Sequence, residues 1–163
     1  MSSRPIRVLL VDDEAELVEY LTKRLTRKGH SVVGTLSGRD AVAALDGQTF
    51  DVAVLDLKMP QMDGLEVLRQ AKSCQPFLEV VILTGHGSIE SALESGRHQA
   101  LRFLSKPYEF DDLSRVIEEA AAAKRQHQKA AFLQAMKELA TTQLSAQEIL
   151  AETERLQREY EQE

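Results

Sequence analysis

Five polar side chains stand where predicted β-strands end. Asp12 and Asp13 follow the first apolar run of the chain, Asp56 and Thr84 end the third and fourth runs, and Lys106 follows the fifth. Short apolar runs bounded by turn residues are typical of strands buried in a parallel sheet. The carboxyl ends of such strands share one edge of the sheet, so these side chains are expected to meet in a single crevice.

Three carboxylates in one crevice predict a bound cation. Without a cation they would repel each other and lose hydration, at a cost on the order of several kcal/mol. Mg²⁺ fits best, because it combines a few carboxylates with waters and a phosphate. An aspartate nucleophile, a metal ion, and a lysine and a threonine that contact phosphoryl oxygens are the parts needed for phosphoryl transfer to a carboxylate. The residues therefore predict a magnesium-dependent phosphoryl-acceptor site.

Each part of this site has a simpler interpretation when it is taken alone. A single aspartate after a strand is typical of a helix cap, a lysine before a proline is typical of surface charge, and a threonine at a strand end is typical of β-structure. The joint occurrence of all five residues at successive strand ends is what favours the functional interpretation.

Strand-like and helix-like patterns alternate from residue 6 onward. The predicted strands cover residues 6–11, 31–36, 51–56, 79–84 and 101–105. The predicted helices end at Gly29, at Gly47 and near Gln75; a fourth covers about 89–95, and a fifth begins after Asp111-Asp112. Five strand–helix units predict an α/β fold, a doubly wound parallel sheet with helices on both faces. The periodicity does not predict the strand order.

The bulk composition bounds the class of protein. The chain has 163 residues, a formal net charge of -6 and a single cysteine. This length allows one domain with an appendage, and the acidic balance excludes a nucleic-acid surface or an anionic membrane as the main partner. No signal peptide and no apolar run of about 20 residues is present, so we expect a cytoplasmic protein with no membrane segment. One cysteine excludes an intrachain disulfide.

Four short motifs carry a resemblance to a known family. They are Val11-Asp12-Asp13-Glu14, Leu55-Asp56-Leu57-Lys58-Met59-Pro60, Leu83-Thr84-Gly85-His86-Gly87 and Phe103-Leu104-Ser105-Lys106-Pro107. Together they resemble the motif set of receiver domains of two-component response regulators, most closely those of the sigma-54 activator group. The resemblance covers roughly residues 6–122, which predicts a receiver domain over residues 1–122 and a helical extension over residues 123–163.

The resemblance implies a fold and a set of metal ligands. The fold would be the flavodoxin-like sheet with strand order 2-1-3-4-5. Asp56 would be the phospho-acceptor and, with Asp13 and the backbone carbonyl of Lys58, would bind Mg²⁺ directly. Asp12 would act through a metal-bound water. A peptide bond in the cis form would join Lys106 to Pro107.

The resemblance also implies how the site is used. The phosphoryl group would come from a phosphohistidine of a sensor histidine kinase, and Thr84 and Lys106 would contact its oxygens. The protein would be a signalling switch that catalyses its own phosphorylation and dephosphorylation, not an enzyme with a separate substrate. Thr84 and Phe103 would be the switch residues, although Phe103 is equally well interpreted as a core residue. Lys58 and His86 would tune the lifetime of the phosphoryl group.

The sequence departs from the family before the fifth strand. Gln99-Ala100-Leu101-Arg102-Phe103 replaces the common pattern of Gly-Ala, one residue, Asp and an aromatic residue, and Gly96 lies upstream of its usual place. Arg97, His98 and Arg102 would add positive charge to the usual signalling face. The usual mode of partner docking is therefore not predicted for this chain.

The residues beyond 122 contain no proline or glycine and are predicted to be helical. Two apolar seams, out of phase with each other, allow two structures. One is a coiled coil with a discontinuity, and the other is two helices joined by a turn near residues 141–145, where Ser145 to Glu148 resembles a capping box. We prefer the coiled coil, which predicts a homodimer. The surplus of acidic residues excludes a basic-zipper DNA reader. The chain stops inside a helical pattern, which favours a downstream effector domain or protein.

Two other functions compete with the receiver interpretation. A phosphotransferase of the haloacid-dehalogenase kind also uses an aspartyl nucleophile, but it requires a second aspartate where this chain has Lys58. A nucleotide-binding Rossmann module is disfavoured because no Gly-x-Gly-x-x-Gly follows the first strand.

Overall fold

The computed structural model describes residues 4–59, 64–85 and 101–162. The five strands are β1 (Arg7–Val11), β2 (Ser31–Thr35), β3 (Val52–Asp56), β4 (Glu79–Thr84) and β5 (Leu101–Ser105). The helices are α1 (Ala15–Arg27), α2 (Gly38–Gly47), α3 (Gly64–Cys74), α5 (Phe110–Thr141) and α6 (Ala146–Gln162). The helix predicted over 89–95, together with His86, Gly96, Arg97 and His98, lies outside the described residues.

All five strands are parallel and form one sheet in the order β2-β1-β3-β4-β5. This order confirms the predicted flavodoxin-like topology. The strand β3 lies at the centre and is buried along its whole length, which explains why it reads as a continuous apolar run that ends in Asp56. The registers keep the carboxyl ends of neighbouring strands level, because Asp56 pairs with Leu83 and Thr84 pairs with Ser105.

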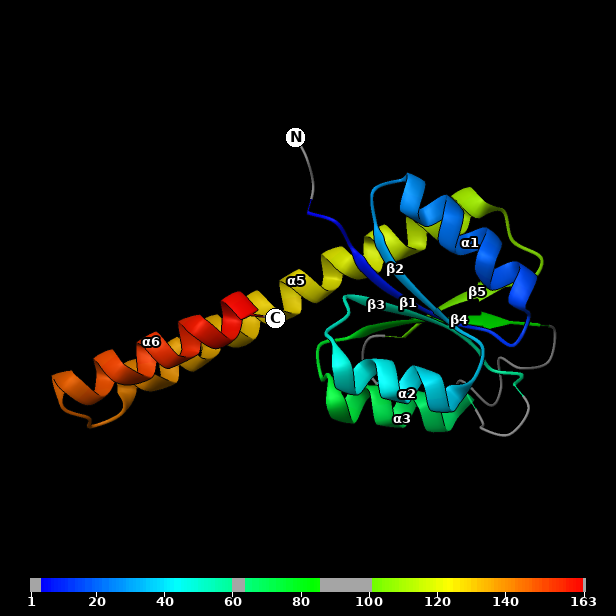
Figure 1. Ribbon diagram of the computed structural model, residues 1–163. Helices are drawn as coiled ribbons and strands as arrows, with labels where there is room; N and C mark the ends of the chain where they lie inside the picture. Colours follow the sequence, from blue (N-terminus) through cyan, green and yellow to red (C-terminus); the bar gives the residue numbers. More distant parts are fainter. Residues whose placement is uncertain (1–3, 60–63, 86–100, 163) are drawn as a thin grey trace. The chain divides into compact units, whose positions relative to one another are not determined.

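Helices cover both faces of the sheet (Figure 1). On one face, Leu21 and Leu25 of α1 and Leu113 and Ile117 of α5 form a core with alternate strand residues. On the other face, α2 and α3 pack against the remaining strand residues around Phe50. This two-sided core holds the strand ends, and therefore the predicted site, in a rigid frame.

Glycines and caps set the local geometry of the first two helices. Gly29 adopts a φ of 93° directly after Lys28, the C-cap residue of α1, in agreement with the predicted end of that helix. Ser37 caps α2, and its hydroxyl accepts a hydrogen bond from the backbone N–H of Asp40 at 3.1 Å. A Cβ atom at Gly34 of β2 would lie 2.4 Å from Cγ1 of Val18, so a side chain there would force Val18 of α1 to shift.

The chain divides into two compact units, residues 1–122 and 123–163. In the second unit, α5 ends at Thr141 and α6 returns beside it (Figure 1), with the rings of Phe132 and Tyr160 stacked 5.0 Å apart. The preferred coiled coil along one long helix is therefore wrong, and the alternative of two helices joined by a turn is what the chain forms. The separate role predicted for residues 123–163 stays a prediction.

Local hydrogen bonds explain the turn between α5 and α6. The hydroxyls of Thr141 and Thr142 both donate to the carbonyl of Glu138, at 2.9 and 2.8 Å, and such side-chain bonds compete with the helical ladder. The predicted capping box then starts α6. The N–H of Ser145 donates to Glu148 at 2.9 Å, and the N–H of Glu148 donates to the Ser145 hydroxyl at 3.3 Å.

Among the described residues, no helix combines the length and the apolar character that crossing a bilayer requires.

Candidate functional site

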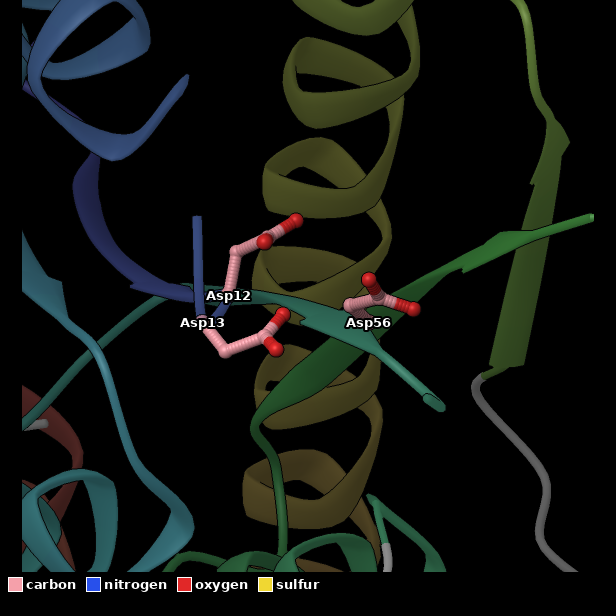
Figure 2. A group of neighbouring side chains, drawn as sticks. All are labelled: Asp12, Asp13 and Asp56. Carbon is pink, nitrogen blue, oxygen red and sulfur yellow. The ribbon is translucent and has the colours of Figure 1, made fainter. Parts of the chain in front are cut away.

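The sheet brings together the five side chains that the sequence placed at strand ends. Asp12 and Asp13 follow β1, Asp56 and Thr84 end β3 and β4, and Lys106 follows β5. Carboxylate oxygens of the three aspartates all lie within 4.8 Å of one another. Figure 2 shows the carboxylates of Asp12 and Asp13 turned toward the side on which Asp56 lies.

Asp56 is held at both of its carboxylate oxygens. Oδ2 accepts a hydrogen bond from Nζ of Lys106 at 3.0 Å, and Oδ1 accepts one from the backbone N–H of Lys58 at 3.0 Å. The side chain is largely buried at the end of the central strand. Asp56 therefore has a defined orientation in the crevice.

Asp12 is buried, and only one of its two carboxylate oxygens has a hydrogen-bond donor among the described residues. Its Oδ1 accepts a hydrogen bond from the backbone N–H of Glu14 at 2.9 Å, whereas Oδ2 has no hydrogen-bond partner among the described residues. Burial raises the pKa of Asp12, the Glu14 hydrogen bond opposes the rise, and the charge of Asp56 adds to it. Asp13, by contrast, is exposed.

Lys106 supplies the positive charge of the site. Its Nζ lies 3.9 Å from Oδ2 of Asp12, in addition to its hydrogen bond with Asp56. Partial burial alone would lower the pKa of Lys106, but the hydrogen bond and charge of Asp56 and the charge of Asp12 outweigh it, and the pKa is raised. Lys106 is therefore a permanent cation at neutral pH. The implied cis peptide bond between Lys106 and Pro107 is present.

The two predicted switch residues differ in their burial. Thr84 is only 1% exposed, and its hydroxyl oxygen has no hydrogen-bond partner among the described residues. Phe103 of β5 is 37% exposed, so the interpretation of Phe103 as a core residue is wrong. The switch roles of both residues stay predictions.

The donor set fits a hard divalent cation. Three carboxylates converge, and Oδ2 of Asp12 and the hydroxyl of Thr84 are buried atoms that lack hydrogen-bond partners in the described part of the chain. Orphaned buried oxygens of this kind indicate a place for an ion and its ligands. Asp13 and Asp56 would hold the ion, with Asp12 acting through a water. The contribution of the Lys58 carbonyl stays a prediction.

Arg102 does not belong to this site. Its guanidinium donates to Glu79 at 2.8 Å, and Glu79, at the opposite end of β4 from Thr84, is only 1% exposed. The positive charge expected from Arg102 on the signalling face is therefore compensated by a buried carboxylate of the neighbouring strand.

Sequence reasoning missed a pocket beside the site. It has a volume of about 530 Å³ and lies between α1 and the segment that joins β5 to α5. The residues that line the pocket include Lys106, Tyr108 and Phe110. The guanidinium of Arg24 lies 3.9 Å from the centre of the Phe110 ring. The phenol oxygen of Tyr108 is buried without a hydrogen-bond partner among the described residues. The only sequence signal for this pocket was the pair of aromatic residues, Tyr108 and Phe110, that follows Lys106-Pro107.

Comparisons with known proteins agree with this geometry. The family described as the response regulator receiver domain matches residues 8–118, which confirms the predicted resemblance. The transcriptional regulatory protein GlrR of Escherichia coli (strain K12) is 38% identical over 120 residues, which cover 74% of this chain and 27% of GlrR. This chain thus spans about a quarter of the length of that relative.

Two solved structures are similar to the chain. The response regulator receiver domain protein from Clostridium thermocellum superposes with a TM-score of 0.69 at 30% identity, covering 74% of this chain and 98% of that one. The adenylate cyclase from Rhodopirellula baltica superposes with a TM-score of 0.75 at 28% identity, covering 85% of this chain and 100% of that one.

Proposed function

The chain belongs to the response regulator receiver domain family of two-component signalling systems, and from this premise we propose that Asp56 accepts a phosphoryl group from a phosphohistidine of a sensor histidine kinase. The observation that carries the proposal is the arrangement around Asp56. Its carboxylate is oriented by Lys106 and Lys58 and lies within reach of the Asp12 and Asp13 carboxylates, where a cation would neutralise the incoming charge.

In the proposed reaction, an oxygen of Asp56 attacks phosphorus. The bond between phosphorus and the histidine nitrogen breaks, an acyl phosphate forms on Asp56, and the leaving imidazole takes up a proton. Lys106 lies where it would stabilise negative charge on the phosphoryl oxygens, and the Thr84 hydroxyl would donate a further hydrogen bond. When bound, Mg²⁺ would supply the remaining charge neutralisation.

Dephosphorylation would reverse the state of the switch. Water attacks the acyl phosphate, inorganic phosphate leaves, and the Asp56 carboxylate is restored. Lys58, two residues after the acceptor in sequence and exposed, would influence access of that water. In the phosphorylated state, Thr84 would turn toward the phosphoryl group and Phe103, exposed in this structure, would turn inward.

The haloacid-dehalogenase alternative finds no support. That chemistry requires an acid/base aspartate two residues after the nucleophile, and this position is Lys58. A lysine has no carboxylate and therefore cannot take this acid/base role.

Several partners remain part of the proposal. They are the sensor histidine kinase, a second copy of the chain, and an effector domain or protein. The name of the relative GlrR, a transcriptional regulatory protein, supports a transcriptional output, although the net charge of -6 disfavours direct binding of nucleic acid by this chain. We also expect the protein to act in the cytoplasm.

Phosphoryl labelling tests the proposal. The full chain is incubated with Mg²⁺ and a small phosphodonor such as acetyl phosphate, and the modified residue is located by mass spectrometry after reductive trapping. We expect label on Asp56 that depends on Mg²⁺ and is lost in Asp56→Asn. Asp40→Asn, an exposed aspartate in the first turn of α2, is the matched control and should keep the label. Label that persists in Asp56→Asn would overturn the assignment.

A further inference from the structure

The hairpin formed by the C-terminal part of α5 and by α6 has a thin interior. Leu139 is buried, but α6 has no buried residue along its 17 positions. Short helices obtain most of their stability from packing of an apolar face, and two helices alone provide little of it. The hairpin would therefore gain stability from a further layer.

The large apolar side chains that the hairpin leaves exposed include two leucines on one face. Leu133 is 48% exposed and Leu150 is 60% exposed. Leu133 precedes the buried Leu139 by six positions, and Leu150 precedes Leu156, a half-buried residue of α6, by the same number. At about 3.6 residues per turn, a separation of six positions corresponds to a rotation of about a third of a turn about the helix axis. Leu133 and Leu150 are therefore each turned by this angle away from the side of their helix that faces the other helix. Because α5 and α6 run in opposite directions, equal rotations bring both leucines to the same face.

Charge is divided between the two helices of the hairpin. The part of α5 beyond residue 122 carries four basic residues and one acidic residue, whereas α6 carries five acidic and two basic residues. A parallel pairing of two extended chains would set acidic α6 beside acidic α6. A face-to-face pairing of two hairpins can instead set each basic segment against an acidic one.

We propose that the face of the hairpin bearing Leu133 and Leu150 is a self-complementary interface through which two copies of the chain form an antiparallel four-helix bundle. A two-fold axis parallel to the helices places α5 of one protomer over α6 of the other, with every neighbouring pair antiparallel. A two-fold axis across the helices would place basic α5 over basic α5, so the charge division selects the first arrangement.

The arrangement predicts a specific ion pair between protomers. The stacking of Phe132 on Tyr160 fixes which positions of the two helices lie level, and it sets residue 137 at the height of about residue 155. Rotation about an axis parallel to the helices preserves height. Lys137 of one protomer then lies beside Glu154 of the partner subunit, at the rim of the leucine face.

Sedimentation of the full chain tests the interface. We expect a reversible dimer in analytical ultracentrifugation, weakened by about tenfold or more in Leu150→Glu, because a charge would then be buried. Ala151→Glu is the matched control. It adds the same charge one position along α6, on an exposed residue that points away from the proposed face, and should leave the dimer unchanged. Circular dichroism of both variants checks that the helices persist.

Charge reversal tests the arrangement of the helices. Lys137→Glu should weaken the dimer, and Glu154→Lys in the same chain should restore it. Monomeric wild-type protein, equal effects of Leu150→Glu and Ala151→Glu, or failure of the double reversal to restore the dimer would each overturn the proposal. The proposal rests on the hairpin alone, so its failure would leave the role of Asp56 untouched.

Discussion

The ammonium nitrogen of Lys106 lies 3.0 Å from Oδ2 of Asp56, across 50 positions of sequence. This hydrogen bond places a cation beside the proposed nucleophile, and carboxylate oxygens of Asp12 and Asp13 lie within 4.8 Å of an Asp56 oxygen. One of the positive charges that the phosphoryl group would need is therefore in place before any ligand binds.

Replacement of Lys106 by alanine separates phosphoryl transfer from metal binding. We expect phosphoryl labelling of Asp56 to fall by about tenfold or more, since a charge-assisted hydrogen bond contributes about 1.5–3 kcal/mol. Affinity for Mg²⁺, measured by isothermal titration calorimetry, should be kept or increased because a competing cation has left the aspartates. Lys23→Ala, at an exposed position of α1, is the control for labelling. Loss of Mg²⁺ affinity in Lys106→Ala would contradict this account.

Neutralising Asp12 should stabilise the metal-free protein at neutral pH. The folded state raises the pKa of Asp12, chiefly through burial, so folding favours its protonated form. The stabilising contribution of the protonated form is present below the unfolded pKa and is lost as pH rises through the raised folded pKa.

Asp12→Asn should therefore gain roughly 1 kcal/mol in urea unfolding at pH 7, and the gain should shrink toward pH 4. The asparagine oxygen can still accept the hydrogen bond from Glu14. Added Mg²⁺ should stabilise the wild-type protein more than Asp12→Asn. A gain that is independent of pH would show that the charge of Asp12 is not its cause.

The phenol of Tyr108 is expected to destabilise the metal-free fold. Its hydroxyl oxygen is buried without a hydrogen-bond partner among the described residues, and burial raises its pKa, so the group stays neutral. Tyr108→Phe should raise the free energy of unfolding by about 1 kcal/mol, because an unsatisfied buried polar group is removed. Tyr20→Phe is the control, since the exposed Tyr20 hydroxyl accepts a hydrogen bond from Arg24 at 2.6 Å and its removal should bring no gain. A loss of stability in Tyr108→Phe would reveal a partner for this hydroxyl.

The ion pair between Arg102 and Glu79 is expected to be structural. Arg102→Ala would leave the buried Glu79 carboxylate without this partner and should cost about 2–3 kcal/mol in urea unfolding. This is below the ~3–5 kcal/mol of fully buried pairs because Arg102 is 31% exposed. Glu79→Gln in the Arg102→Ala background should recover part of the loss. Additive effects of the two substitutions would argue against coupling. Labelling of Asp56 should be unchanged in both variants.

Much of the fold was predictable because buried parallel strands leave a strong local signal. The strands β3 and β4 each contain four consecutive apolar residues directly before Asp56 and Thr84, so both the strands and their functional ends could be located. The strand order came only with the family resemblance, because periodicity does not record which strands become neighbours.

Other features depended on contacts between distant segments. The pairing of Arg102 with Glu79 joins neighbouring strands, so the sequence around Arg102 alone reads as added surface charge. The exposure of Phe103 depends on what covers β5, which an aromatic residue in an apolar strand does not reveal. The break in the C-terminal helix had a local cause in Thr141 and Thr142, but the return of α6 along α5 involves contacts between distant residues, such as the stacking of Tyr160 on Phe132.

The sequence by itself determined which groups the site contains, because strand ends are local features and parallel strands must end at one edge. Only the tertiary structure decided how those groups meet. It set Lys106 against Asp56, left Oδ2 of Asp12 without a hydrogen-bond partner in the described part of the chain, and placed Tyr108 in a neighbouring pocket. Distances of a few ångströms arise from the packing of helices on the sheet, and no local pattern in a sequence specifies them.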